Sequence, residues 1–313
     1  MALEKPCRPE TLWEKIVFRG SFALGFLGIF ALASLQNAPA EKQSAAETPG
    51  LLARRYQEGE KLSYHMKGVN EKWRYEIQTD GVVKRDSSGR YFEEYTWSHL
   101  ISDGVPVTFS STTSNFRQIV SLAPETPPSL PNLSQVDPRL IGPITDWMTF
   151  YVDLWLANRL KKLSHAGDHF YFKRGTPNSW ADGKHVSLGE DSIDFDFTLK
   201  NVNQTDEIAT LLVRHVPPEK PEIRIPVEWM RPPVADTPNN WVEVEKRPND
   251  KYLAEVGKET FDVHIEVSLA NGKILSAKIN NPVEAVLREC ADATLTNCTA
   301  SVPHHILRQI EIY

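Results

Sequence analysis

Apolar and polar residues alternate along much of the chain, and this pattern predicts a sheet. Two successive runs place large apolar side chains at every second position, namely Leu62, Tyr64, Met66 and then Trp73, Tyr75, Ile77. A period of two residues is typical of strands that bury one face. The Asp80 and Gly81 pair after the second run predicts a hairpin turn. Further short runs, RYFEEYTW, VPVTF and RQIVSL, extend the predicted antiparallel sheet.

A long apolar segment in the middle of the chain predicts one buried helix from Thr145 to Ser164. Thr145 is suited to cap the helix N-terminus, and Asp146 complements the positive end of the helix dipole. Lys161 and Lys162 complement the negative end. Four large aromatic residues lie in this segment, namely Trp147, Phe150, Tyr151 and Trp155. Because apolar residues cover most of the circumference, we expect the helix to pack against the sheet.

The last part of the chain returns to strands, with its cleanest alternation over residues 261–269. Apolar side chains occupy one face there, at Phe261, Val263, Ile265, Val267 and Leu269. A loop over residues 270–272, with Gly272 left-handed, keeps apolar residues paired across the hairpin. The pairs that it predicts are Val267 with Leu275, Ile265 with Ala277 and Val263 with Ile279. A two-residue turn would set Ile265 against Lys278, so the pattern favours the longer loop.

Together these elements predict an α+β fold that is predominantly antiparallel β. A curved sheet is expected to form an open half-barrel packed on the one long apolar helix. The expected organisation is a β-rich domain over residues 51–216, with the helix at 145–164, and a C-terminal β section over 241–313. Proline is dense in residues 217–240, which excludes helix and central strand and predicts a connector.

The N-terminus has the pattern of an export segment. Four basic residues, Lys5, Arg8, Lys15 and Arg19, precede the apolar run of residues 20–35, and an A-x-A motif follows at residues 38–40. This pattern predicts a signal peptide over residues 1–40. A signal anchor stays open as the alternative, with residues 41–50 as a spacer. In both cases the rest of the chain is expected to be extracytoplasmic, either periplasmic or secreted and released or tethered to the membrane.

Composition and cysteine usage agree with an exported globular protein. A formal charge of −6, without a basic stripe, argues against a nucleic-acid partner. Cys290 and Cys298 are the two cysteines beyond the export segment, and in an oxidising compartment they predict a disulfide. A two-thiol metal or redox site is disfavoured, because the spacing is not C-x-x-C and no histidine is adjacent.

Candidate catalytic chemistry centres on an acidic stretch after the helix. Its members are Glu190, Asp191, Asp194 and Asp196. Strand alternation places Asp194 and Asp196 on one face, where two carboxylates can divide acid and base work or bind calcium. The outer face of a half-exposed strand is polar by default, however. A carboxylate-dependent hydrolase is therefore only the second alternative, and no catalytic residue is assigned.

The histidines give no firm metal site. His165 and His169 flank the helix end and, with Asp168, have ligand types that suit zinc. Gly167 is expected to end the helix between them, which removes the i, i+4 alignment. His304 and His305 are adjacent and in a strand would point apart. The sequence also lacks G-x-S-x-G, P-loop, G-x-G-x-x-G and H-E-x-x-H motifs. We therefore expect no metal and no cofactor.

The first strand-like run carries a family resemblance at Gly59, Glu60, Leu62 and Tyr64. These residues resemble the G-E-x-L-x-Y strand that opens a family of exported bacterial β-rich domains of unknown function. The outline of a curved antiparallel sheet with a buried helix is also similar to periplasmic lipoprotein carriers of the Lol type. This second resemblance covers about residues 56–216 and assigns no functional residue.

The leading interpretation is a non-enzymatic protein that binds a hydrophobic small molecule or lipid between sheet and helix. The large number of aromatic residues supports it, although such residues also simply fill cores. The candidate ligand-binding residues are Trp147, Phe150, Tyr151 and Trp155. The alternative is a structural or interaction module of the cell envelope, whose partners are other envelope proteins.

Overall fold

The computed structural model describes ten segments of the chain. They are residues 49–71, 73–134, 136–160, 163–173, 180–181, 185–188, 194–216, 241–247, 250–292 and 294–313. The predicted export segment, nearly all of the spacer, the connector at 217–240, and both Glu190 and Asp191 lie outside the described residues. No helix in the described segments combines the length and the apolar character that a membrane span requires.

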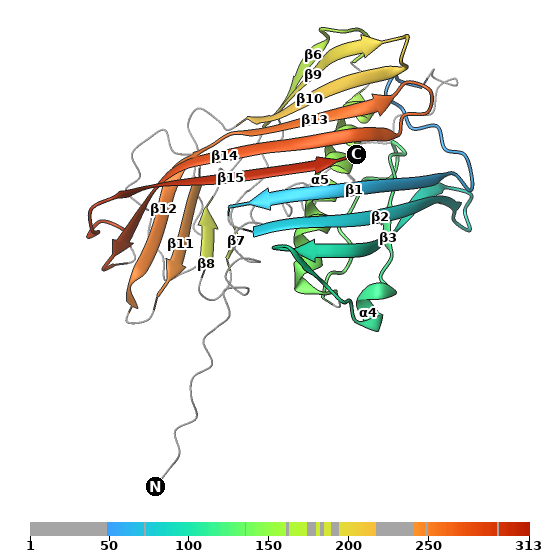
Figure 1. Cartoon of the computed structure of the whole chain (residues 1–313). Helices are drawn as coiled ribbons and strands as arrows, with labels where there is room; N and C mark the ends of the chain where they lie inside the picture. Colours follow the sequence, from blue (N-terminus) through green and yellow to red (C-terminus); the bar gives the residue numbers. More distant parts are fainter. Residues whose placement is uncertain are drawn as a thin grey trace.

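The described strands belong to one antiparallel sheet, which does not close on itself (Figure 1). Its centre is a ribbon of long strands, formed by β12 (Tyr252–Glu259), β13 (Phe261–Ser268), β14 (Ile274–Cys290) and β15 (Val302–Ile312). Thr260 alone separates β12 from β13. The first part of β14 pairs with β13 and the last part with β12, while β15 runs along its other side.

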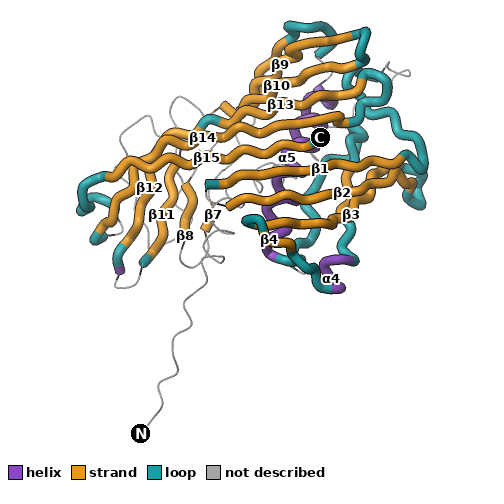
Figure 2. The backbone as a smooth tube through the Cα atoms, in the orientation of Figure 1, coloured by secondary structure: helices purple, strands orange, loops and turns teal. Residues whose placement is uncertain are grey.

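Three further groups of strands flank this ribbon (Figure 2). Beside β15 lie β1 (Lys61–Asn70), β2 (Trp73–Arg85), β3 (Tyr91–Ser102), β4 (Val105–Pro106) and β5 (Gln118–Val120). Beside β13 lie β10 (Ile208–Val216), β9 (Asp194–Asn203) and β6 (His169–Phe172). Beside β12 lie β11 (Trp241–Lys246), β8 (His185–Leu188) and β7 (Trp180–Ala181). The C-terminal part of the chain thus supplies the central strands.

A proline marks the point at which β14 changes partner. Pro282 lies between Asn280, the last residue paired with β13, and Val283, the first paired with β12. Its carbonyl accepts a hydrogen bond from Thr260 N–H at 3.0 Å. Because proline has no N–H to offer, it is tolerated where the ladder is interrupted.

The alternation of apolar and polar residues predicts the first two strands correctly, but the turn predicted after the second strand is wrong. The six apolar residues of the first two runs are all buried, at Leu62, Tyr64, Met66, Trp73, Tyr75 and Ile77. No turn occurs at Asp80 and Gly81, because β2 continues to Arg85. Gly81 is needed for another reason: a Cβ there would lie 2.3 Å from the ring of Tyr95 on β3. The glycine leaves space for a buried ring rather than forming a turn.

The predicted hairpin register in the ribbon is confirmed for two of its three pairs. Val263 faces Ile279 and Ile265 faces Ala277, and Gly272 has the expected positive φ of 73°. The third pair is wrong, because the register shifts before Val267, which faces Ile274 instead of Leu275. The shift adds one residue to β14 and leaves Ile274 buried.

The helix α5 (Pro138–Leu160) begins earlier and ends earlier than predicted. Proline is favoured at the first helical position, and the preceding Asp137 accepts a hydrogen bond from Arg139 N–H at 3.0 Å. Thr145 therefore does not cap the helix; its hydroxyl donates to the Gly142 carbonyl at 2.8 Å. A second helix, α4 (Ser111–Ser114), is a single turn.

The expectation of an apolar helix is not supported. Asp146, Asp153 and Asn158 are all buried in α5, with exposed fractions of 3%, 1% and 7%. Buried carboxylates require partners. The helix lies behind the strands of the ribbon and of β1 and β2 and runs across them (Figures 1 and 2), so those partners come from the sheet.

Candidate functional site

The four aromatic residues proposed as ligand contacts lie in the core. Trp147, Phe150, Tyr151 and Trp155 are each at most 1% exposed. The ring of Trp147 has its centroid 4.8 Å from that of Tyr64 and 5.1 Å from that of Tyr95. Their side chains pack against the sheet and against one another. Their role in binding a ligand stays a prediction.

A buried ion pair lies in the same interface between α5 and the sheet. This pair was not predicted from the sequence. Arg54 Nε donates to Glu93 Oε1 at 2.9 Å, and both side chains are fully buried. The Tyr151 hydroxyl donates to Glu93 Oε2 at 2.6 Å and the Tyr95 hydroxyl at 3.1 Å. Glu60 accepts from Arg54 Nη2 at 2.7 Å. This network joins the segment before β1 to β3 and α5.

Burial and charge in this network raise the pKa values of its two tyrosines and of its arginine. Burial raises the pKa of both Tyr95 and Tyr151 well above the usual value, and the negative charge of Glu93 adds to the effect. Burial alone would lower the pKa of Arg54, but Glu93 and Glu60 more than offset it, so that the pKa is raised. The tyrosines stay hydrogen-bond donors and the arginine stays a cation, which suits a structural role.

The two buried aspartates of α5 anchor it to opposite parts of the sheet. Asp146 accepts a hydrogen bond from the Tyr75 hydroxyl at 2.8 Å and forms an ion pair with Arg308 of β15. Asp153 lies 3.2 Å from His215 Nε2, and this histidine is on β10. In both contacts a buried carboxylate is paired with a group from the sheet. We interpret them as anchors of the helix.

Glu259 at the end of β12 lies close to the same groups. Burial raises the pKa of its carboxyl, while the hydrogen bond from Asn281 and the nearby charges of Arg308 and His215 oppose the shift. Asn281 Nδ2 lies 2.9 Å from Glu259 Oε1. A perturbed carboxyl can indicate a functional site. Here the surrounding groups belong to the anchors of α5, so we assign it no chemistry.

The acidic stretch proposed for catalysis is only partly described. Asp194 accepts from the Tyr171 hydroxyl at 2.8 Å, and Asp196 lies 2.5 Å from His169 Nε2. Each carboxylate therefore has its own partner on the neighbouring β6. The hydrolase hypothesis stays a prediction.

The histidines point to separate carboxylates. His165 Nδ1 lies 3.7 Å from Asp168 Oδ2, whereas His169 pairs with Asp196. Across the described segments, no group of three or more histidine, cysteine, aspartate or glutamate side chains is arranged to hold a metal ion. Cys290 and Cys298 form the predicted disulfide, with an S–S distance of 2.07 Å.

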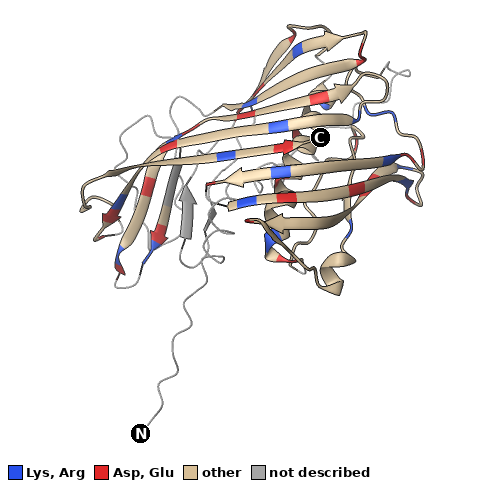
Figure 3. Ribbon diagram, viewed as in Figure 1, with Lys and Arg blue, Asp and Glu red and all other residues tan. Residues whose placement is uncertain are grey.

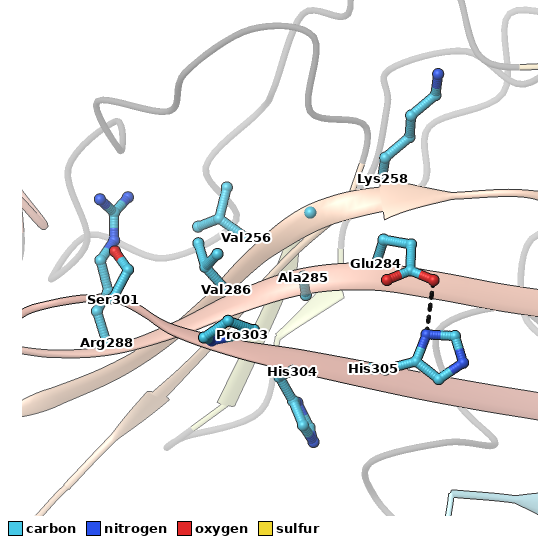
Figure 4. Close-up of a pocket in the computed structure, with 11 residues that line it drawn as sticks. Val256, Lys258, Glu284, Ala285, Val286, Arg288, Ser301, Pro303, His304 and His305 are labelled. Carbon is cyan, nitrogen blue, oxygen red and sulfur yellow. Dashed lines mark ion pairs between the residues drawn. The ribbon is translucent and has the colours of Figure 1, made fainter.

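A hollow of about 500 Å³ lies instead on the ribbon, over β12, β14 and β15 (Figure 4). Its floor is apolar and consists of Val256, Val286 and Pro303, which share one strand face, while Lys258, Glu284, Ala285, Arg288, Ser301, His304 and His305 complete its lining. Gly257 allows the two strands to approach closely. A Cβ there would lie 2.3 Å from the Glu284 carbonyl oxygen and 2.6 Å from Ala285 Cα.

Charged groups stand at the two ends of this hollow. Glu284 and His305 form an ion pair at 2.8 Å, and Glu284 is the cross-strand partner of Lys258. Arg288 lies four residues farther along β14, beside Ser301 (Figure 4). His304 points away from His305, as predicted, and its Nε2 lies 3.4 Å from Glu71.

Comparison of the chain with protein-family models, with curated proteins and with solved structures found no match. The geometry of the hollow is therefore the basis for the function proposed below. An apolar floor with charged ends can hold an elongated molecule that has an apolar body.

Sequence analysis missed this hollow because its residues come from strands that are far apart in the chain. Val256 and Val286 face each other only in the observed register of β12 and β14. The one local signal is the alternation of Glu284, Val286 and Arg288 along one strand face. That pattern resembles an ordinary half-exposed strand.

Proposed function

We propose that this protein is non-enzymatic and extracytoplasmic and that it binds a hydrophobic or lipid-like ligand. The observation that carries the proposal is the hollow on the ribbon, whose volume of about 500 Å³ is within the range of small-molecule sites. The open half-barrel around α5 is part of the same proposal. The helix is tied to the ribbon by the buried ion pair between Asp146 of α5 and Arg308 of β15.

The hollow suits an apolar body better than the interface between helix and sheet does. Val286 is half-buried and Pro303 beside it is exposed, so both keep apolar surface that a ligand can cover, whereas Val256 is 4% exposed and adds little. Burial of apolar surface is the main favourable term in binding such a ligand, about 25 cal/mol per Å². In contrast, Trp147 and Trp155 are already 0% exposed and contact other side chains. We therefore propose the ribbon, and not the interface between α5 and the sheet, as the ligand site.

Val286→Asp is expected to weaken binding of a neutral apolar dye such as Nile red by at least about tenfold, because the ligand would have to cover a carboxylate. Val302→Asp is the matched control. Val302 lies opposite Leu287, on the other face of the ribbon, and is 59% exposed. The measurement is a fluorescence titration of the purified protein and the two variants. A wild-type protein that does not bind the dye, or equal losses in both variants, would contradict the proposal.

A second candidate function, an envelope interaction module, is favoured by one edge of the sheet. The terminal strands β4 and β5 expose Val105 and Ile119 by 65% and 54%. Exposed edge strands can pair with a strand of another protein. Crosslinking in intact cells through a photoreactive residue at position 119 tests this function, and an absence of protein adducts would count against it.

A further inference from the structure

We propose that the ligand of the hollow carries an anionic head, a carboxylate or phosphate, which Arg288 binds while the apolar chain lies over Val286 and Val256. This inference rests on the proposed function and specifies the class of ligand. It assigns the two ends of the hollow different roles, with the head at Arg288 and the tail directed toward Lys258.

Arg288 has a buried donor at the hollow that lacks a hydrogen-bond partner. Its Nε is buried and makes no hydrogen bond, and no ion pair reaches this residue from the described part of the chain. Its cross-strand neighbour on β12 is Ala254, which offers no side-chain acceptor. A buried donor of a charged group is costly to leave unpaired, and a ligand that supplies an acceptor removes that cost.

The chemistry of arginine selects the head. Its planar guanidinium presents a fork of donors that matches carboxylate and phosphate oxygens in a bidentate way. Ser301 lies beside Arg288 at the same end of the hollow (Figure 4), where its hydroxyl can donate a further hydrogen bond to an anion. A cationic head would be repelled by the guanidinium, and a neutral hydroxyl would accept a hydrogen bond without neutralising its charge.

The other end of the hollow is less suited to an anion. Lys258 is exposed, and the carboxylate of its cross-strand neighbour Glu284 is paired with His305. An exposed ammonium stays hydrated, so an anion gains less from it than from the partly buried Arg288. Arg288 is four positions after Glu284 on β14, a distance of about 13 Å at the rise of a strand. Val286 lies midway between them and is paired with Val256 and Pro303. An alkyl chain that starts at Arg288 therefore runs over the apolar floor.

The test is displacement of Nile red from the full chain by dodecanoate, dodecyl phosphate and dodecanol, with acetate and inorganic phosphate as heads without a chain. Wild-type protein is expected to bind both anionic amphiphiles about tenfold more tightly than dodecanol. Arg288→Gln is expected to remove that preference while dodecanol binding stays within about twofold. Because the side chain of Arg288 makes no hydrogen bond or ion pair with the described residues, this variant is expected to fold normally. Lys258→Gln, the matched control at the other end, is expected to keep the preference.

The outcomes separate this inference from the proposed function. Equal binding of dodecanol and dodecanoate by wild-type protein, or a preference that survives Arg288→Gln, would overturn the anionic head but leave apolar binding intact. Loss of the preference in Lys258→Gln instead would reverse the assigned orientation and overturn the inference. If acetate or inorganic phosphate displaced the dye as effectively as the amphiphiles did, the hollow would be a simple anion site that does not bind an alkyl chain, which would overturn the inference. Failure of every amphiphile and of the dye itself would overturn the proposed function.

Discussion

Glu93→Ala is expected to lower the free energy of unfolding by about 3–5 kcal/mol, the range for breaking a buried ion pair by removing one partner. The variant leaves the fully buried guanidinium of Arg54 without its nearest carboxylate. It also removes the acceptor of the Tyr95 and Tyr151 hydroxyls, neither of which is more than 1% exposed. Urea unfolding followed by tryptophan fluorescence measures the change.

Glu94→Ala is the matched control for this experiment. Glu94 is the next residue of β3, and it pairs with Lys84 on the surface at 2.5 Å. Exposed pairs of this kind contribute at most about 1 kcal/mol. A double variant, Arg54→Met with Glu93→Leu, is expected to recover part of the stability, because it removes both fully buried charges together. Glu60, whose side chain is 16% exposed, keeps its hydrogen bond from Asn271. Equal effects of Glu93→Ala and Glu94→Ala would show that the Arg54 pair is not buried as described.

Asp146→Ala is expected to destabilise the protein by a similar amount, about 3–5 kcal/mol, and to loosen α5 from the sheet. The change leaves Arg308, which is 3% exposed, without a carboxylate, and leaves the Tyr75 hydroxyl without its acceptor. Urea unfolding gives the change in free energy. Hydrogen exchange of the α5 amides reports the loosening, which is expected as faster exchange under native conditions.

Glu311→Ala provides the control on the same strand as Arg308. Glu311 pairs with Lys278 at 2.6 Å, and both side chains are about half exposed, at 49% and 48%. Positive and negative residues are interspersed along the strands of the sheet (Figure 3). We expect a change below about 1 kcal/mol and unaltered exchange of α5. If α5 exchanged equally fast in both variants, Asp146 would not be an anchor of the helix.

The strands were predictable wherever one face is buried and the other wet. This condition holds for β1, β2 and β13, whose burial alternates residue by residue. The helix boundaries were less predictable, because Thr145 resembles a cap, whereas Asp137 with Pro138 forms the true start. The glycine at position 81 resembles a turn residue, but its function depends on the ring of Tyr95 from another strand.

The buried charges and the hollow were beyond prediction for a common reason. Arg54 and Glu93 look like surface residues in the sequence, and only the fold brings them into one core network. Likewise, Arg288 resembles an ordinary strand residue until β12 and β15 flank it. Long-range pairing creates these environments. Local pattern describes which residues are buried in a strand, but not which strands become neighbours.

The position of a bound ligand tests the central claim most directly, namely that the ribbon and not the helix interface forms the site. A crystal structure of the protein with dodecanoate brominated at its terminal carbon locates the chain by the anomalous signal of bromine. We predict the carboxylate at Arg288 and the bromine beyond Val286, toward Lys258. A bromine between α5 and the sheet, beside Trp147 or Trp155, would contradict the account.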